Sequence, residues 1–185
     1  MPFKEPEELL RDLQSEDPSR VTEALAGLAH SLDSFGWEIS LPSLSLDVLA
    51  PLGAKPSRQV QENFFSLVTG YLEFDPPLTD EARVVLLVGL CLRYADPYIA
   101  LQTALWLKGR GLPLVAQALN ELARHGLKGP AAVRGAQLLF SSLLDGSAEV
   151  RRLTVAALRD LPESASYEQV RSYVRPQLEA GEQLT

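Results

Sequence analysis

The stretch Asp145-Gly-Ser-Ala-Glu-Val-Arg-Arg-Leu-Thr-Val-Ala-Ala-Leu-Arg-Asp-Leu161 decides the fold class. It combines a helix-start signal, the pair Val150-Arg151 and small apolar residues at helical spacing. Apolar residues that recur every three or four positions lie on one face of an α-helix. The stretch therefore predicts an amphipathic helix with one face that packs against neighbouring helices.

This stretch resembles the second helix of a HEAT-type repeat. In that family an acidic residue opens the helix, a Val-Arg pair such as Val150-Arg151 follows, and alanines at positions such as Ala156 and Ala157 allow tight packing against the next repeat. Fainter echoes of the pattern extend the resemblance over residues 80–161. The resemblance implies an architecture of stacked helix pairs and no particular chemistry.

Composition and turn signals favour helices along the whole chain. Leucine occurs 35 times and the β-branched isoleucine only twice among the 185 residues, which suits helices better than strands. Breaks at Asp96-Pro97, at Gly111 and at Gly129-Pro130 carry turn chemistry. About nine helices with short connections have the periodicity of a helical-repeat array. We expect an all-α protein, a right-handed α-α superhelix or HEAT-like solenoid, with an irregular first part.

A single domain is expected over residues 1–185, with N-terminal capping helices at 1–33, an irregular connecting segment at 34–56 and helical repeats at 57–181. The segment from 80 to 95 is apolar over most of its circumference, which predicts a central, nearly enclosed helix. Pro176 is expected to kink or end the last helix. In the irregular segment, Trp37 and Ile39 either pack over the solenoid or form an apolar patch for a partner or a second copy of the chain.

The residues that usually carry chemistry are few. The chain has two histidines, His30 and His125, and one cysteine, Cys91, and none of them belongs to a nucleophile, phosphate-binding or metal-binding motif. We therefore expect no catalytic residue, no metal and no cofactor, and hence no enzyme. His125 is expected to complement a helix C-terminus, and Cys91 to be a small buried core residue.

Charge is unevenly distributed along a chain of net charge −7. Residues 1–100 carry 7 basic and 16 acidic side chains, whereas residues 101–162 carry 8 basic and 4 acidic ones. This pattern favours either ordinary solvated helix faces or a basic patch for an acidic partner. The residues proposed for such a patch are Lys108, Arg110, Arg134, Arg151 and Arg152. The resemblance implies that Arg151 contacts an acid of a neighbouring repeat, so that Arg152, which points elsewhere, is the better candidate for a partner.

The leading interpretation is a non-enzymatic, cytoplasmic module for protein–protein interaction, that is, an adaptor, scaffold or regulatory subunit that binds another protein through an acidic peptide segment. A homodimer is an open alternative. A second class is a DNA-binding HEAT-like protein related to alkylation-repair glycosylases, with Trp106 near the bound base; the acidic net charge argues against a nucleic acid partner. No apolar run long enough for a membrane span occurs.

Overall fold

The computed structural model describes residues 8, 11–12, 15–17, 19–21, 23–24, 39–40, 74–75 and 79–182. The chain divides into two compact units, Met1–Thr79 and Asp80–Thr185. Most of the first unit, including Trp37, His30 and the predicted boundaries at 33/34 and 56/57, lies outside the described residues. The single domain predicted from the sequence therefore stays a prediction.

In the first unit the described residues include short helical stretches and one pair of very short strands. Residues 19–21 and 23–24 are helical, and the side chains of Val21 and Ala24 are fully buried. β1 (Ile39–Ser40) pairs in parallel with β2 (Phe74–Asp75), with Ile39 opposite Phe74. The predicted partner-binding residue Ile39 is thus a strand residue.

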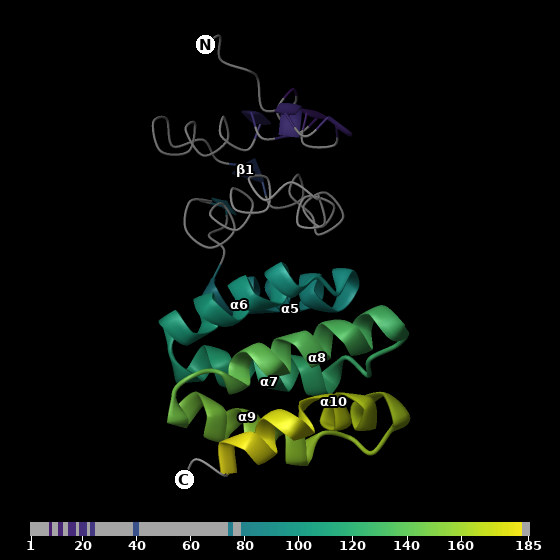
Figure 1. The fold of residues 1–185 in the computed structure, drawn as a ribbon. Coiled ribbons are helices and arrows are strands. Elements are labelled where there is room, and N and C mark those ends of the chain that lie inside the picture. The colour runs from purple at the N-terminus through teal and green to yellow at the C-terminus, as the bar shows by residue number, and fades with distance from the viewer. Residues whose placement is uncertain are drawn as a thin grey trace. The chain divides into compact units, whose positions relative to one another are not determined.

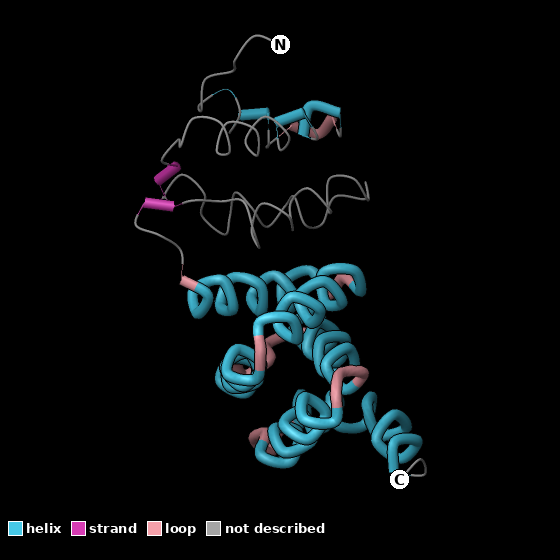
Figure 2. Tube along the Cα trace, turned by 90° about the vertical axis from the view of Figure 1, so that its left-hand side faces the viewer, coloured by secondary structure: helices cyan, strands magenta, loops and turns pink. Residues whose placement is uncertain are grey.

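The described part of the second unit consists of helices joined by short connections (Figures 1 and 2). The connections range from Gly111 alone to residues 125–129. The all-α class is confirmed for residues 80–182. The helices are α5 (Asp80–Tyr94), α6 (Pro97–Arg110), α7 (Leu112–Arg124), α8 (Pro130–Leu144), α9 (Ala148–Asp160) and α10 (Ala165–Glu182).

Local side-chain chemistry sets the helix boundaries where the sequence predicts them. Asp96 caps α6, because its Oδ1 accepts hydrogen bonds from the backbone N–H groups of Tyr98 and Ile99 at 2.8 and 3.3 Å. Gly111 separates α6 from α7 with a φ of 118°, a conformation that favours glycine. α9 begins at Ala148 with Ser147 as its cap, since the Ser147 hydroxyl and not Asp145 accepts from the Val150 N–H, at 3.3 Å.

The helices lie in three successive pairs, α5 with α6, α7 with α8, and α9 with α10 (Figure 1). α8 packs against both α5 and α6, and α9 packs against both α7 and α8, whereas α10 packs along α8. Each pair is therefore joined to the previous one through an apolar interface, and the side chains of that interface form one continuous core.

Among the helices of residues 80–182 the most enclosed is α8, and not the segment 80–95 as predicted. α8 contacts α5, α6, α9 and α10 and buries eight of its residues, including Phe140 and Leu139. α5 buries one face, but Val85 on the opposite face is 40% exposed. Gly135 allows α8 to approach α5, because a Cβ at this position would overlap the backbone carbonyl of Cys91. The apolar residues of segment 80–95, on which the prediction rested, gave no sign that Gly135 of α8 would contact α5.

Pro176 lies inside α10, which continues to Glu182, so of the two predicted effects, a kink or a helix end, the helix end does not occur. Proline has no N–H to donate to the carbonyl four residues earlier, which belongs to Ser172. Ser172 is an exposed residue, and a carbonyl that solvent reaches can accept a hydrogen bond from water instead. The side chain of Gln177, next to the proline, holds α10 on α8 by donating to the Ser141 carbonyl at 2.9 Å.

Candidate partner-binding groove

A groove of about 810 Å³ lies between α9 and α10. Its apolar lining comes from Ala148, Val155, Ala156, Leu158, Val174 and Leu178. Its charged lining consists of arginines alone, with no carboxylate among the lining residues: Arg151, Arg152, Arg159, Arg171 and Arg175. We call this feature the arginine groove. Five arginines with no carboxylate among the lining residues stand out in a chain whose net charge is −7.

Arg151 is a structural member of the arginine groove. Its guanidinium donates to the carbonyl of Leu144, the last residue of α8, at 3.3 Å, and to the carbonyl of Gln177 on α10 at 3.1 Å. Carbonyls at a helix C-terminus lack partners within the helix and attract cations. The structural role implied for Arg151 is therefore present, but its partners are backbone carbonyls and not an acid. Gly181 leaves room for this guanidinium, since a Cβ there would overlap it.

Arg171 makes the equivalent connection from α10 back to α9. Its Nε donates to the carbonyl of Leu158 at 3.0 Å, and its Nη2 donates to the carbonyl of Leu161, just beyond the end of α9. Glu168 lies 3.7 Å away on the same helix. Arg151 and Arg171 thus hold the two sides of the arginine groove in place while keeping their full positive charge inside it.

The remaining three arginines are available to a ligand. Arg175 forms an ion pair with Glu168 at 3.4 Å, but both side chains are more than half exposed, so the pair is weak. Arg152 and Arg159 are exposed, and neither has a hydrogen bond or an ion pair with any residue in the described part of the chain. They are seven residues apart on α9, which places them on one face, about 10.5 Å apart along the helix axis.

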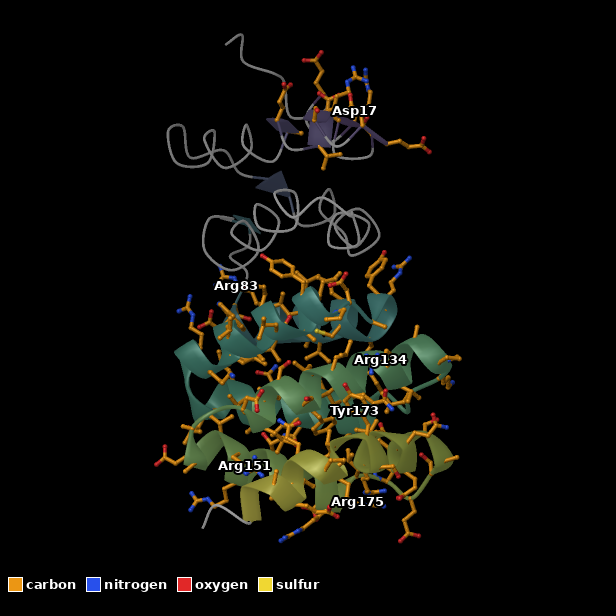
Figure 3. All side chains as sticks on the ribbon, viewed as in Figure 1. Asp17, Arg83, Arg134, Arg151, Tyr173 and Arg175 are labelled. Atoms are coloured by element: carbon orange, nitrogen blue, oxygen red, sulfur yellow. The ribbon has the colours of Figure 1, made fainter. Side chains whose placement is uncertain are left out.

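The other residues predicted for a basic patch are not in the arginine groove. The guanidinium of Arg134 on α8 lies 5.1 Å from the centroid of the Tyr173 ring on α10 (Figure 3). Lys108 donates to the Ser142 carbonyl at 3.1 Å, which connects α6 to α8. Arg110 lies over the Trp106 ring and 3.8 Å from Asp80. The structure therefore brings together Arg151 and Arg152 of the predicted set and separates the rest.

Sequence reasoning missed Arg171 and Arg175 and did not single out Arg159 for a partner. Arg159 follows Arg152 by seven residues, so the helical period alone would have found it. Arg171 and Arg175 are four residues apart on the last helix and carry the same kind of signal. Nothing in the sequence says that the two arginine rows face one groove, because that follows from the packing of α10 on α8.

The most reactive types of side chain in the described part of the chain, a cysteine and a histidine, are not arranged for catalysis. Burial raises the pKa of the Cys91 thiol to about 12, against the smaller opposite effect of the hydrogen bond between its Sγ and the Thr103 hydroxyl at 3.5 Å. This thiol is a protonated core residue and not a nucleophile. His125 ends α7, as predicted, with its Nε2 3.6 Å from Glu121. Within the described ranges no cluster of His, Cys, Asp and Glu side chains has the makings of a metal site.

None of the described helices is both long enough and apolar enough to cross a membrane. Comparison of the chain with protein-family models, with curated proteins and with solved structures finds no match. The resemblance to HEAT repeats therefore rests on the residues quoted for it and stays a prediction.

Proposed function

We propose that the protein is a non-enzymatic interaction module, an adaptor, scaffold or regulatory subunit, whose arginine groove binds an acidic segment of another protein. The observation that carries this proposal is the groove itself, lined by five arginines and no carboxylate. The HEAT-like superhelical arrangement and the cytoplasmic location belong to the same proposal. Successive helix pairs that pack on one another over residues 80–182 support the architectural part.

The arrangement of the arginines suits recognition of carboxylates. Five like charges in one groove repel one another, and the helix carbonyls that accept from Arg151 and Arg171, together with the ion pairs of Glu168, offset that repulsion only in part. Carboxylates on a ligand neutralise the remaining positive charge of the groove. The planar guanidinium suits them because it binds a carboxylate through two parallel hydrogen bonds. Arginine is also enriched among the residues that dominate protein–protein affinity.

The apolar lining distinguishes this site from a surface that only attracts counterions. Val155, Ala156 and Leu178 are at least partly exposed in the groove between the arginines. Apolar area that a ligand covers contributes about 25 cal/mol for each Å² removed from water. A ligand that combines carboxylates with apolar side chains is therefore favoured over a purely charged polymer.

The proposal is tested by titrating a fluorescein-labelled 12-residue peptide of Glu, Asp and Leu with the full chain and measuring fluorescence anisotropy. We expect saturable binding that weakens as salt is added and that falls at least about tenfold in Arg152→Glu and in Arg159→Glu. The matched control is Lys128→Glu, which makes the same charge change at an exposed loop position outside the groove. Equal affinity of all four proteins would contradict the proposal.

The DNA-binding alternative is tested in the same titration with a labelled DNA duplex. Trp106, the aromatic residue considered for that function, lies on α6 under Arg110 and is absent from the groove lining. Its indole Nε1 is buried, which removes the indole N–H from the surface that would meet a base. Tight duplex binding that is lost in Arg152→Glu would favour the alternative.

A further inference from the structure

The packing of α5 to α10 indicates what shape of ligand the arginine groove accepts. Three times in this unit a helix packs against both members of the preceding helix pair: α7 and α8 each pack against α5 and α6, and α9 packs against α7 and α8. α9 and α10 form the next pair, and no helix in the described part of the chain packs against both of them from the groove side. A helix is therefore the element that the surface between two such helices receives elsewhere in the molecule.

The chemistry of the groove selects one kind of helix. Ala156 and Val155 lie on α9 between Arg152 and Arg159, one helical turn from each, and Arg175 lines the opposite side from α10. An apolar strip with cations on both sides is complementary to a helix that carries an apolar stripe with carboxylates on both flanks.

The spacing of the free arginines agrees with this shape. Arg152 and Arg159 are separated by two turns of α9, about 10.5 Å along its axis. A ligand helix that lies along α9 presents residues i and i+7 at the same separation, and residues i+3 and i+4 then meet the apolar strip. An extended acidic segment covers the same 10.5 Å with about three residues and turns alternate side chains away from the groove.

We propose that the arginine groove receives an amphipathic α-helix of a partner protein, with an apolar stripe flanked by Asp or Glu residues two turns apart. This inference rests on the proposed function and makes it more specific, because it names the conformation and the residue pattern of the ligand. A second copy of the chain is the competing occupant.

The test uses three fluorescein-labelled 18-residue peptides and the full chain. The first peptide has glutamates at positions i and i+7 and leucines at positions i+3 and i+4, repeated along its length; the second has the same composition in an order that breaks this pattern; the third is the first with lysine for glutamate. Anisotropy gives the affinity, and circular dichroism gives the change in helix content on binding. We expect the first peptide to bind at least about tenfold more tightly than the second, to gain helix on binding, and to be bound in preference to the third.

Two variants separate the contributions of charge and shape. Arg159→Glu is expected to weaken the first peptide at least about tenfold, whereas Lys128→Glu leaves it unchanged. Ala156→Trp fills the apolar strip without a change of charge, and because Ala156 is exposed the variant keeps its fold. We expect Ala156→Trp to weaken the first peptide by several-fold or more and to leave the second within twofold.

Each remaining outcome overturns a defined part of the proposal. Equal binding of the first two peptides would overturn the helical ligand and leave the acidic-segment function standing. Absence of binding by both acidic peptides would overturn the function as well. Self-association of the chain alone in analytical ultracentrifugation, abolished by Arg159→Glu but not by Lys128→Glu, would assign the groove to a second copy and overturn the separate partner.

Discussion

Two arginine-rich regions of the second unit differ in how their charge is compensated. Where α5 begins, Asp80 lies 3.0 Å from Arg83 and 3.8 Å from Arg110, and Arg110 also covers the Trp106 ring. In the arginine groove between α9 and α10, no lining residue is a carboxylate; Glu168 pairs with Arg171 and Arg175 on α10, but Arg152 and Arg159 on α9 have no carboxylate partner in the described part of the chain. Arginine content alone therefore says little about partner binding; the difference lies in whether the fold supplies the counter-charge. The following predictions test this difference, from the largest expected effect to the smallest.

The largest effect is expected from Gly135→Ala, which asks whether the two regions belong to one cooperative unit. The added Cβ would overlap the Cys91 backbone carbonyl and force α8 away from α5. We expect a loss of about 3 kcal/mol in the free energy of unfolding, measured by urea denaturation, in one transition that also abolishes peptide binding. The matched control is Gly109→Ala, where a Cβ meets nothing within 4 Å; a gain of about 0.5 kcal/mol is expected there. If Gly135→Ala still binds the peptide at urea concentrations above its unfolding transition, the two regions are independent.

Arg171→Ala tests whether the arginine groove is held together by its own cations. The change removes donors to the carbonyls of Leu158 and Leu161. We expect a loss of about 2 kcal/mol, because these are charge-assisted hydrogen bonds to groups that then lack a protein partner. Arg175→Ala, which removes the exposed ion pair with Glu168, is expected to cost less than about 0.5 kcal/mol. Equal stabilities of the two variants would contradict the structural role of Arg171.

Asp80→Asn removes the counter-charge from the compensated region. Arg83 and Arg110 then lack their carboxylate, and α5 loses a favourable acid in its first turn. We expect a loss of about 1 kcal/mol that shrinks as salt is added to the denaturation series. Glu81→Gln changes the same helix turn with no ion pair in the described part of the chain and isolates the dipole effect. An equal loss of stability in Glu81→Gln would show that the helix dipole, and not the ion pairs of Asp80, accounts for the effect.

The smallest effect on stability is expected from the double variant Arg152→Ala/Arg159→Ala. Both side chains are exposed and have no partner among the described residues, so the free energy of unfolding should change by less than about 0.5 kcal/mol. Binding of the acidic amphipathic peptide should nevertheless fall at least about tenfold. A destabilised double variant would mean that these two arginines serve the fold, as Arg151 and Arg171 do.

The sequence predicts the parts of the fold that depend on neighbouring residues. Asp96-Pro97 and Gly111 act within one helical turn, and the boundaries that they predict are confirmed. Pro176 also acts locally, but α10 continues past it, so of the predicted kink or helix end the end does not occur. The central position of α8 depends on Gly135 meeting a carbonyl more than forty residues earlier, and no local pattern carries that information.

In the candidate site, too, the sequence predicts what depends on neighbouring residues and not what depends on contacts between distant helices. Arg152 follows Arg151 in the sequence, and the expectation that the two point in different directions agrees with one donating to main-chain carbonyls of α8 and α10 and the other lying exposed. Arg134 and Lys108 belong to the same basic stretch, yet they contact Tyr173 and the Ser142 carbonyl on other helices. Net charge along a sequence predicts that a basic region exists but not which of its cations share a groove.

The hydrogen bonds by which Arg151 and Arg171 connect α8, α9 and α10 place few limits on how the sequence of these helices can vary. The acceptors of both guanidinium groups in α8, α9 and α10 include main-chain carbonyls of Leu144, Leu158 and Gln177. A main-chain carbonyl is present whatever side chain stands at that position, so these bonds impose little restriction on residue identity there. The apolar strip of the groove can therefore be substituted to suit a different ligand stripe while the same two arginines preserve the distance between the helices.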